Sequence, residues 1–416
     1  MTDIAAHAHD RQEHRDLVAA HQKLSRSRVN LAATTYAKAL TANHRDVLQA
    51  SVASTMGELA TAEKTLSGTN AEAFFQGVGI GTLQTCLGGV QSSYQQISAH
   101  DDNQAAQDIA AVSGACLTLA GGAGGGLVYP FDFPDPGVIL VGDTYFAYAT
   151  NSVAGTIQII ESTDLVHWNA AANALPSLPG WATPGATWAP AVALINGAFV
   201  LYYAANVAGP GGGEECISAA TAIQPQGPFS DTSSAPLECQ PSLGGSLDPS
   251  PFVDADGRTY LVWKSNGGAG PATIWSEQLD AAGTGFATNA TPAQLLVPSQ
   301  AWEAGVVEAP DLVTSGGRYF LVYSGNNWNS AKYAVGVSTC TGPQGPCTKP
   351  LSQPILSSGA DMQGPGGESV FTDTSGSFWI AFDAFLPKAV GYPHNRDLYL
   401  RRLDLSGATP VVEQAG

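Results

Sequence analysis

The clearest structural signal in the chain is the segment DPSPFVDADGRTYLVW, residues 248–263. An apolar run ending at Val253 is followed by the polar run DADG and then by a second apolar run, which ends at Trp263. Asp-Gly pairs favour hairpin turns because both residues tolerate a positive φ angle. The segment therefore predicts two antiparallel strands joined by a tight turn.

The same pattern of apolar strand, tight turn and aromatic strand occurs five times along the chain. The repeats are DPGVILVGDTYFAYAT, APAVALINGAFVLYYA, DPSPFVDADGRTYLVW, APDLVTSGGRYFLVYS and GESVFTDTSGSFWIAF. They begin at Asp135, Ala189, Asp248, Ala309 and Gly367, which are 54 to 61 residues apart. A unit made only of strands that returns at a steady period above forty residues is typical of propeller blades. We therefore predict a mainly β fold, a five-bladed β-propeller closed around a central axis.

The distribution of proline divides the chain into two architectures. All 26 prolines lie at or beyond Pro130, and all eight tryptophans follow it. The preceding alanine-rich part carries apolar residues at helical spacing, which predicts a small α-helical bundle domain over residues 1–120. The run GGAGGG falls in a predicted Gly-rich linker over residues 121–128. The propeller, as the catalytic domain, is expected over residues 129–416.

Charge and hydropathy exclude several classes of partner. Lys and Arg number 17 against 35 Asp and Glu, a formal net charge of −18. Because nucleic-acid affinity depends largely on cations that neutralise phosphates, we expect no nucleic-acid partner. The sequence has no run of 18 or more apolar residues, the length that a membrane span needs, and the first residues lack the apolar core of a secretory signal.

The six cysteines form three local pairs and lack the close spacing of a zinc site. The pairs are Cys86 with Cys116, Cys216 with Cys239, and Cys340 with Cys347. We interpret them as disulfides, with unpaired buried thiols as the alternative. Since disulfides persist in oxidising compartments, we expect a secreted or cell-surface protein whose export segment is not in this sequence. A membrane or cell-wall tether through a missing N-terminal segment stays open.

Four histidines near the start of the chain raise the question of a metal site. They are His7, His9, His14 and His21. On the polar start of an exposed helix, solvated histidines are the favoured interpretation, and we predict no metal ligands among them.

Three repeats have a carboxylate at their first residue, which we call the head of the repeat, or directly before it. Asp135 and Asp248 begin the first and third repeats, and Glu308 directly precedes the fourth. Because the inner strand of each blade starts near the axis, we expect these three side chains around one axial pocket. When carboxylates lie close together, the repulsion between their charges raises the pKa of one relative to the other. One group can then act as an acid and the other as a base, as the cleavage of a glycosidic bond requires. The alternative for each residue is a turn-forming role without chemistry.

Aromatic and cationic residues near the heads suggest how a sugar could be held. Trp188, directly before the second repeat, has the right phase to stack on the apolar face of a sugar ring, and Phe133 is a second candidate. Arg396 could reach a hydroxyl or a carboxylate as a forked donor, with a solvated surface position as the alternative.

These features resemble glycoside hydrolase family 43. The similarity covers roughly residues 129–405 and rests on DPGVI with GDTYF, STDLVHW, TWAPAV, SLDPSPFVDADGRTYLVW, VVEAPDLV and GPGGESVF. The resemblance implies that Asp135 is the general base, Asp248 the pKa modulator and Glu308 the general acid, with Trp188 beside the sugar. It also implies inversion of configuration, in which Asp135 activates a water molecule.

The chain departs from the family pattern at the centre of the propeller. Many members carry a histidine after Gly-Pro-Gly that helps to hold a central cation. Here Gly367 and Glu368 follow that motif, and Asp383 stands where a histidine often occurs. We therefore expect that no cofactor is required, and a structural calcium is left as an open alternative.

The resulting prediction is a glycoside hydrolase that cleaves arabinofuranosyl or xylosyl linkages of plant or cell-wall polysaccharides. Its partner would be an oligosaccharide or polysaccharide that contains arabinose or xylose. Two alternatives stay open: a non-catalytic carbohydrate-binding propeller, which needs the aromatic platform but not all three carboxylates, and a fructan-type furanoside hydrolase.

Overall fold

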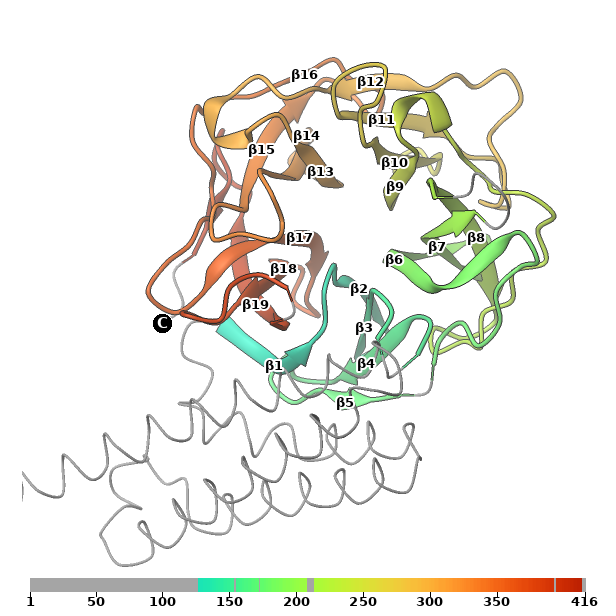
Figure 1. Cartoon of the computed structure of the whole chain (residues 1–416), viewed down its shortest axis with the longest axis horizontal. Coiled ribbons are helices and arrows are strands. Elements are labelled where there is room, and N and C mark those ends of the chain that lie inside the picture. Colours follow the sequence, from blue (N-terminus) through green and yellow to red (C-terminus); the bar gives the residue numbers. More distant parts are fainter. Residues whose placement is uncertain (1–125, 153–154, 172, 208–212, 393, 414–416) are drawn as a thin grey trace, which may run out of the picture.

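The protein is described by a computed structural model that covers residues 126–413 except 153–154, 172, 208–212 and 393. Five antiparallel sheets stand like blades around a central axis, as Figure 1 shows. The predicted β-propeller is therefore confirmed. The predicted helical domain, its four histidines and the Cys86–Cys116 pair lie outside the described residues.

The blades follow one another along the chain. Blade one contains β2 (Gly137–Val141), β3 (Thr144–Ala149), β4 (Gln158–Ser162) and β5 (Asn169–Ala170). Blade two contains β6 (Ala182–Ile195), β7 (Ala198–Val207) and β8 (Glu215–Ala222). Blade three contains β9 (Ser246–Val253), β10 (Thr259–Ser265), β11 (Thr273–Gln278) and β12 (Ala293–Leu296). Blade four contains β13 (Val307–Ser315), β14 (Arg318–Gly325), β15 (Ala334–Cys340) and β16 (Cys347–Thr348).

The fifth blade is built from both ends of the described chain. It contains β17 (Gln363–Thr372), β18 (Phe378–Phe385), β19 (Arg396–Asp404) and β1 (Leu127–Asp132), and β20 (Val411–Val412) also pairs with β19. Strand β1 lies antiparallel to β19, with Tyr129 opposite Leu398. This pairing closes the ring by covering what would otherwise be an open strand edge. Two short 3₁₀ helices, Pro241–Leu243 and Ala301–Glu303, lie between strands.

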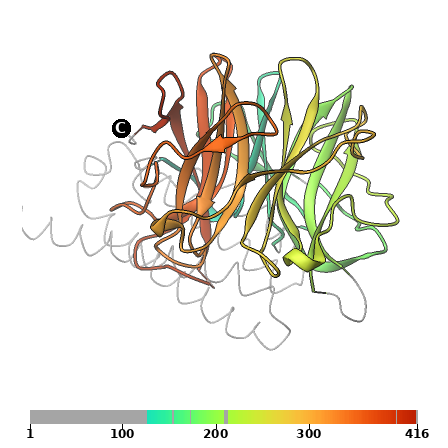
Figure 2. The same ribbon diagram turned by 90° about the horizontal axis from the view of Figure 1, so that it is seen from above.

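The turns and the core explain why this sequence folds into blades. Asn196 and Gly197 join β6 to β7, and both have positive φ, as the predicted Asn-Gly hairpin turn requires. Seen edge-on in Figure 2, adjacent sheets face each other. Each of the five interfaces between blades contains an apolar cluster. Phe146 and Leu201 share one cluster, and the fully buried Trp263 belongs to the next.

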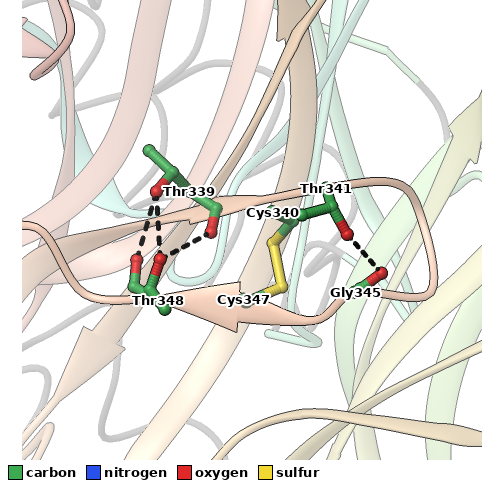
Figure 3. Close-up of a disulfide and its surroundings, with 6 residues drawn as sticks. All are labelled: Thr339, Cys340, Thr341, Gly345, Cys347 and Thr348. Carbon is green, nitrogen blue, oxygen red and sulfur yellow. Dashed lines mark hydrogen bonds between the residues drawn. A yellow bond between two sulfur atoms is a disulfide. The ribbon is translucent and has the colours of Figure 1, made fainter.

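Two of the predicted disulfides are present. Cys216 is bonded to Cys239, and Cys340 is bonded to Cys347. The second joins residues that pair across β15 and β16, as Figure 3 shows. Within the described part of the chain, every cysteine is bonded, and no helix has the length and apolarity to cross a membrane.

Candidate active site

The start of every repeat has the same unusual backbone conformation. Asp135, Ala189, Asp248, Ala309 and Gly367 all have φ between 46° and 60°. In blades two to five the register of the inner strand pair shifts at this point. Such bulges re-aim side chains and are common next to active sites. Left-handed backbone at residues other than glycine is strained, and this strain recurs around the axis.

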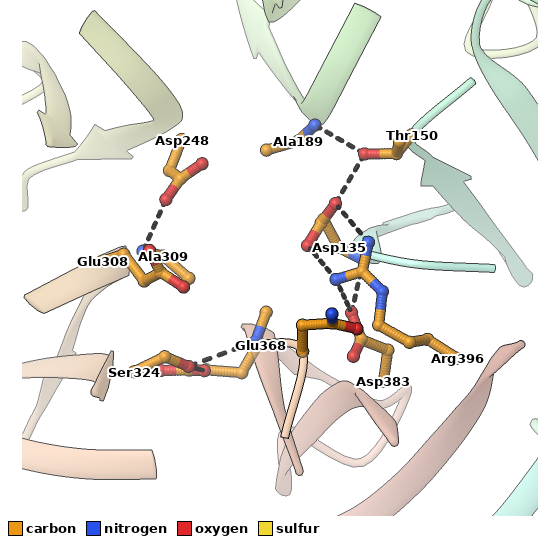
Figure 4. A network of polar contacts seen from close by, with 12 residues as sticks. Asp135, Thr150, Ala189, Asp248, Glu308, Ala309, Ser324, Glu368, Asp383 and Arg396 are labelled. Carbon is orange, nitrogen blue, oxygen red and sulfur yellow. Dashed lines mark hydrogen bonds and ion pairs between the residues drawn. The ribbon is translucent and has the colours of Figure 1, made fainter. Parts of the chain in front are cut away.

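The bulges surround a cavity of about 340 Å³. Every blade contributes a side chain to its lining, and these include Asp135, Trp188, Asp248, Glu308 and Glu368. Figure 4 shows Asp135 on one side of this space, with Asp248 and Glu308 on the opposite side. The sequence prediction that the three carboxylates converge on one axial pocket agrees with this placement.

Two of the three other predicted site residues also line the cavity. Trp188 does so and is 38% exposed as a residue, and Arg396 reaches the cavity from β19. The prediction for Phe133 is wrong. Its ring is fully buried in the core, where it lies edge-on to Tyr129 with centroids 5.6 Å apart, so it has no face to offer a sugar.

Asp135 is held by three neighbours. Nη1 of Arg396 lies 3.0 Å from its Oδ1, and Oγ1 of Thr150 donates a 2.6 Å hydrogen bond to its Oδ2. The backbone N–H of Asp135 donates to Oδ2 of Asp383 at 2.8 Å. These contacts fix both the carboxylate and the backbone that carries it (Figure 4).

Arg396 is bound between carboxylates. Its Nη1 is also 3.2 Å from Oδ2 of Asp383, and its guanidinium lies over the ring of Trp328 at 4.7 Å from the centroid. Asp383 is fully buried, and this burial raises its pKa against the opposing pull of Arg396. Asp383 and Trp328 were not among the residues predicted from the sequence to form the site.

A buried ion pair forms the opposite wall. Nζ of Lys264 lies 2.5 Å from Oε2 of Glu308, and both side chains are almost fully buried. Burial raises the pKa of Asp248 to about 6; the charge of Lys264 opposes this rise, and that of Glu308 adds to it. Lys264 is a cavity-lining residue that the sequence analysis missed.

Two more carboxyl groups, Glu368 and Asp311, line the cavity. Burial raises the pKa of Glu368 well above its ordinary value, and its Oε2 accepts a hydrogen bond from Oγ of Ser324. Asp311 is also buried, and burial raises its pKa to about 6 while its carboxylate accepts bonds from Ser250 and from the backbone of Val370. Burial therefore favours the protonated form of Glu368.

The residues at the centre do not fit the family's cation site. A Cβ added to Gly367 would lie 2.7 Å from Oδ2 of Asp383 and 2.9 Å from Oδ1 of Asp135, so a larger residue has no room there. The guanidinium of Arg396 already contacts both of those carboxylates. Among the residues described, no group of three or more Asp, Glu, His or Cys side chains is arranged to hold a metal.

This arrangement can support acid–base chemistry. One carboxyl group, Asp135, contacts a guanidinium and accepts a hydrogen bond from a hydroxyl, and these partners orient it as a group that accepts a proton from water should be oriented. On the opposite wall, Glu308 pairs with the ammonium of Lys264 and lies close to Asp248. A substrate between the two walls would meet a base on one side and a potential acid on the other.

Comparison with known proteins identifies relatives of the propeller. The sequence model for glycosyl hydrolases family 43 matches residues 127–409. The chain is 37% identical over 122 residues to an arabinoxylan arabinofuranohydrolase of Bacillus subtilis, covering 25% of this chain and 22% of that enzyme. It is 25% identical over 247 residues to a beta-xylosidase of the same organism, covering 56% of this chain and 43% of that enzyme. The chain thus spans less than half the length of both relatives.

A solved structure resembles the chain over a larger share of its length. The crystal structure of an endo-1,4-beta-xylanase from Bacteroides thetaiotaomicron superposes with a TM-score of 0.60 at 29% identity. The match covers 70% of this chain and 96% of that one.

Proposed function

Because the chain belongs to glycosyl hydrolases family 43, we propose that it hydrolyses arabinofuranosyl or xylosyl linkages of plant or cell-wall polysaccharides with inversion of configuration. The observation that carries this proposal is that Asp135, Asp248 and Glu308, from three different blades, line one cavity. The activities named for the two Bacillus subtilis relatives support the choice of sugars.

In the proposed mechanism, Asp135 and Glu308 act on opposite sides of the sugar. Asp135 takes a proton from a water molecule, whose oxygen forms the new bond to the anomeric carbon. Glu308 gives a proton to the glycosidic oxygen as the bond to the leaving group breaks. Asp248 sets the charge around Glu308, and Arg396 with Thr150 holds Asp135 in position.

The size and lining of the cavity suit a small part of a polysaccharide. Its volume of about 340 Å³ lies at the lower end of the range for small-ligand sites. Trp188 and Trp328 offer apolar ring surface on its wall, and the carboxylates and Arg396 offer partners for hydroxyl groups. We propose that one pentose unit occupies the cavity, with the remaining chain or the leaving group outside it.

The deciding experiment compares wild-type protein with Glu308→Ala on aryl arabinofuranosides and xylosides, with arabinan and xylan as polymeric substrates. We expect the substitution to reduce turnover about a hundredfold or more. Proton NMR of the first product should show the inverted anomer. Asp143→Ala, which removes an exposed turn carboxylate, is the matched control and should retain activity.

Other outcomes would favour the alternatives. Unchanged turnover in Glu308→Ala removes Glu308 from the mechanism. Sugar binding by the wild type without any hydrolysis would favour a carbohydrate-binding propeller, and release of products from inulin but not from arabinan would favour a fructan hydrolase.

The two disulfides support a location in an oxidising compartment. We propose that the protein works outside the cytoplasm, as a secreted or cell-surface enzyme. Fractionation of the source cells, followed by thiol labelling with and without reductant, tests this. Labelling of Cys216 and Cys340 without reductant would contradict it.

A further inference from the structure

Lys264 occupies a position that has an equivalent in every blade. On the second strand of each blade, or directly after it in blade one, one residue lies opposite the residue that precedes the head of the repeat. These residues are Thr150, Ala204, Lys264, Ser324 and Asp383.

In three blades this residue has a structural task. The side-chain oxygens of Thr150, Ser324 and Asp383 accept the backbone N–H of the next repeat's head, at 2.9, 3.1 and 2.8 Å. A lysine has no acceptor and cannot do this. In blade three, Oδ2 of Asp248 accepts the N–H of Ala309 instead. The hydrogen bond that links one blade to the head of the next repeat therefore does not explain why residue 264 is a lysine.

The charged neighbours of Lys264 are carboxylates that line the cavity. Its ammonium lies 2.5 Å from Oε2 of Glu308 on β13, and Asp248 on β9 also faces it, with Asp135 across the cavity. Burial lowers the pKa of Lys264, but these carboxylates outweigh that effect, so its pKa is raised and it stays a cation at neutral pH. A buried cation is tolerated when it is paired in this way.

We propose that Lys264 is a positioning residue for Glu308: it holds Oε2 and leaves Oε1 to donate the proton to the leaving oxygen. This inference rests on the proposed function. As the glycosidic bond breaks, its electron pair stays on the leaving oxygen, which takes the proton from Oε1. Glu308 then becomes a carboxylate beside the ammonium of Lys264, which favours the donation because opposite charges attract.

Two substitutions separate the charge of Lys264 from its hydrogen bond. Lys264→Met keeps the length and apolar stem but removes both, and Lys264→Gln keeps a donor without the charge. For glycosides with poor leaving groups, which need protonation, we expect Lys264→Met to reduce kcat about ten- to a hundredfold. For dinitrophenyl glycosides, which leave without protonation, kcat should change little.

The pH profile supplies a readout that a purely structural role would not move. The charged groups that face one another here are Asp248, Lys264 and Glu308, so the profile reports the cluster as a whole. Removing the positive charge should shift the alkaline limb of kcat/KM upward by about one pH unit or more in both variants. In a Glu308→Ala background, Lys264→Met should have no further effect on the dependence on leaving group.

Lys349→Met is the matched control. Lys349 is also a buried lysine, and its ammonium lies 2.5 Å from Oε1 of Glu303, away from the cavity lining. This variant should lower thermal stability without changing the pH profile or the dependence on leaving group.

The outcomes separate this inference from the proposed function. If wild-type protein hydrolyses no glycoside, the proposed function fails. If the wild type is active and the Lys264 variants lose the same factor on every leaving group with an unmoved alkaline limb, the role of Lys264 is overturned. If Lys264→Met does not fold, Lys264→Gln, which keeps a hydrogen-bond donor, tests the role of Lys264 by the same two measurements: the dependence of kcat on leaving group and the position of the alkaline limb.

Discussion

Oδ2 of Asp248 accepts a 2.9 Å hydrogen bond from the backbone N–H of Ala309, the residue directly after Glu308. Both Asp248 and Ala309 have left-handed backbone conformations. The bond therefore ties the strained head of blade three to that of blade four, at the point from which Glu308 projects. Asp248 acts on Glu308 in two ways, through its charge and through the backbone.

These two effects can be separated by substitution of Asp248. Asp248→Asn keeps an acceptor for the Ala309 N–H but removes the charge, whereas Asp248→Ala removes both. We expect both variants to lose activity, and Asp248→Ala alone to lose a further ~1–3 kcal/mol of unfolding free energy, because it leaves a backbone donor unsatisfied. Urea unfolding and kcat measure the two effects. Equal stability of the two variants would show that the hydrogen bond contributes little.

Arg396 should be irreplaceable by lysine. Its Nη1 contacts both Asp135 and Asp383, and a lysine is a point charge that cannot reproduce the planar fork. We expect Arg396→Lys to reduce kcat about tenfold or more by misplacing the base. Arg396→Met should in addition destabilise the protein by ~3–5 kcal/mol, because it leaves buried carboxylates without their cation. A lysine variant with wild-type kcat would refute the positioning of Asp135 by this residue.

Chelation should leave the enzyme active. Because Arg396 supplies positive charge to the carboxylates at the centre, and Gly367 leaves no room for a ligand side chain, we expect turnover to be unaffected by prolonged dialysis against EDTA. The measurement is kcat before and after dialysis, with and without added calcium. A loss that calcium restores would reveal a cation site that these residues do not predict.

The fold could be predicted because its signals are local and periodic. Turn dipeptides such as Asn196-Gly197 fix hairpins, the repeat period indicates blades, and the five repeats give their number. Asp135, Asp248 and Glu308 could be predicted as site residues because they stand at equivalent places in their repeats, and such residues meet at the axis. Periodicity is thus sufficient to locate side chains at the strand heads.

The errors have equally specific causes. Phe133 lies only two residues before Asp135, yet the chain first lines the cavity at Asp135, and the preceding residues pack into the core. Asp311, which the sequence did not single out, follows the bulge of blade four closely and is buried. Bulges change which side chains face inward, and alternation along a strand does not reveal them.

Some residues that were missed left a signal in the sequence. Lys264 and Asp383 each follow the head of their repeat by 16 residues, and Thr150 and Ser324 follow theirs by 15. Comparing the ends of the repeats, as well as their heads, would have grouped these four residues. Trp328 lies in a loop outside the repeated pattern, so only the three-dimensional structure places it over Arg396.

The two tryptophans of the cavity should affect catalysis differently. Trp188 is 38% exposed and Trp328 39%, but only Trp328 also packs on Arg396. We expect Trp188→Ala to raise KM about tenfold with little change in kcat, because it removes only binding surface. Trp328→Ala should lower kcat as well, since Arg396 and hence Asp135 lose support. Tyr392→Ala, an exposed aromatic residue outside the cavity lining, is the control and should change neither constant.

Glu368 should make the stability of the protein depend on pH. Burial raises the pKa of this carboxyl group well above its ordinary value, so the folded state binds a proton that the unfolded state releases above about pH 4.3. The stability that this group contributes is therefore complete below that pH and is lost as the pH rises toward the folded pKa. The expected slope is about 1.4 kcal/mol per pH unit.

Glu368→Gln tests this relation because glutamine is neutral at every pH and still offers an acceptor to Ser324. We expect the variant to gain stability relative to the wild type as the pH rises from 5 to 8, measured by urea unfolding at each pH. Asp311 and the other buried carboxyl groups are present in both proteins, so their contributions cancel in the difference. Parallel stability curves would mean that burial does not raise the pKa of Glu368, and the preference of this group for its protonated form would have to be abandoned.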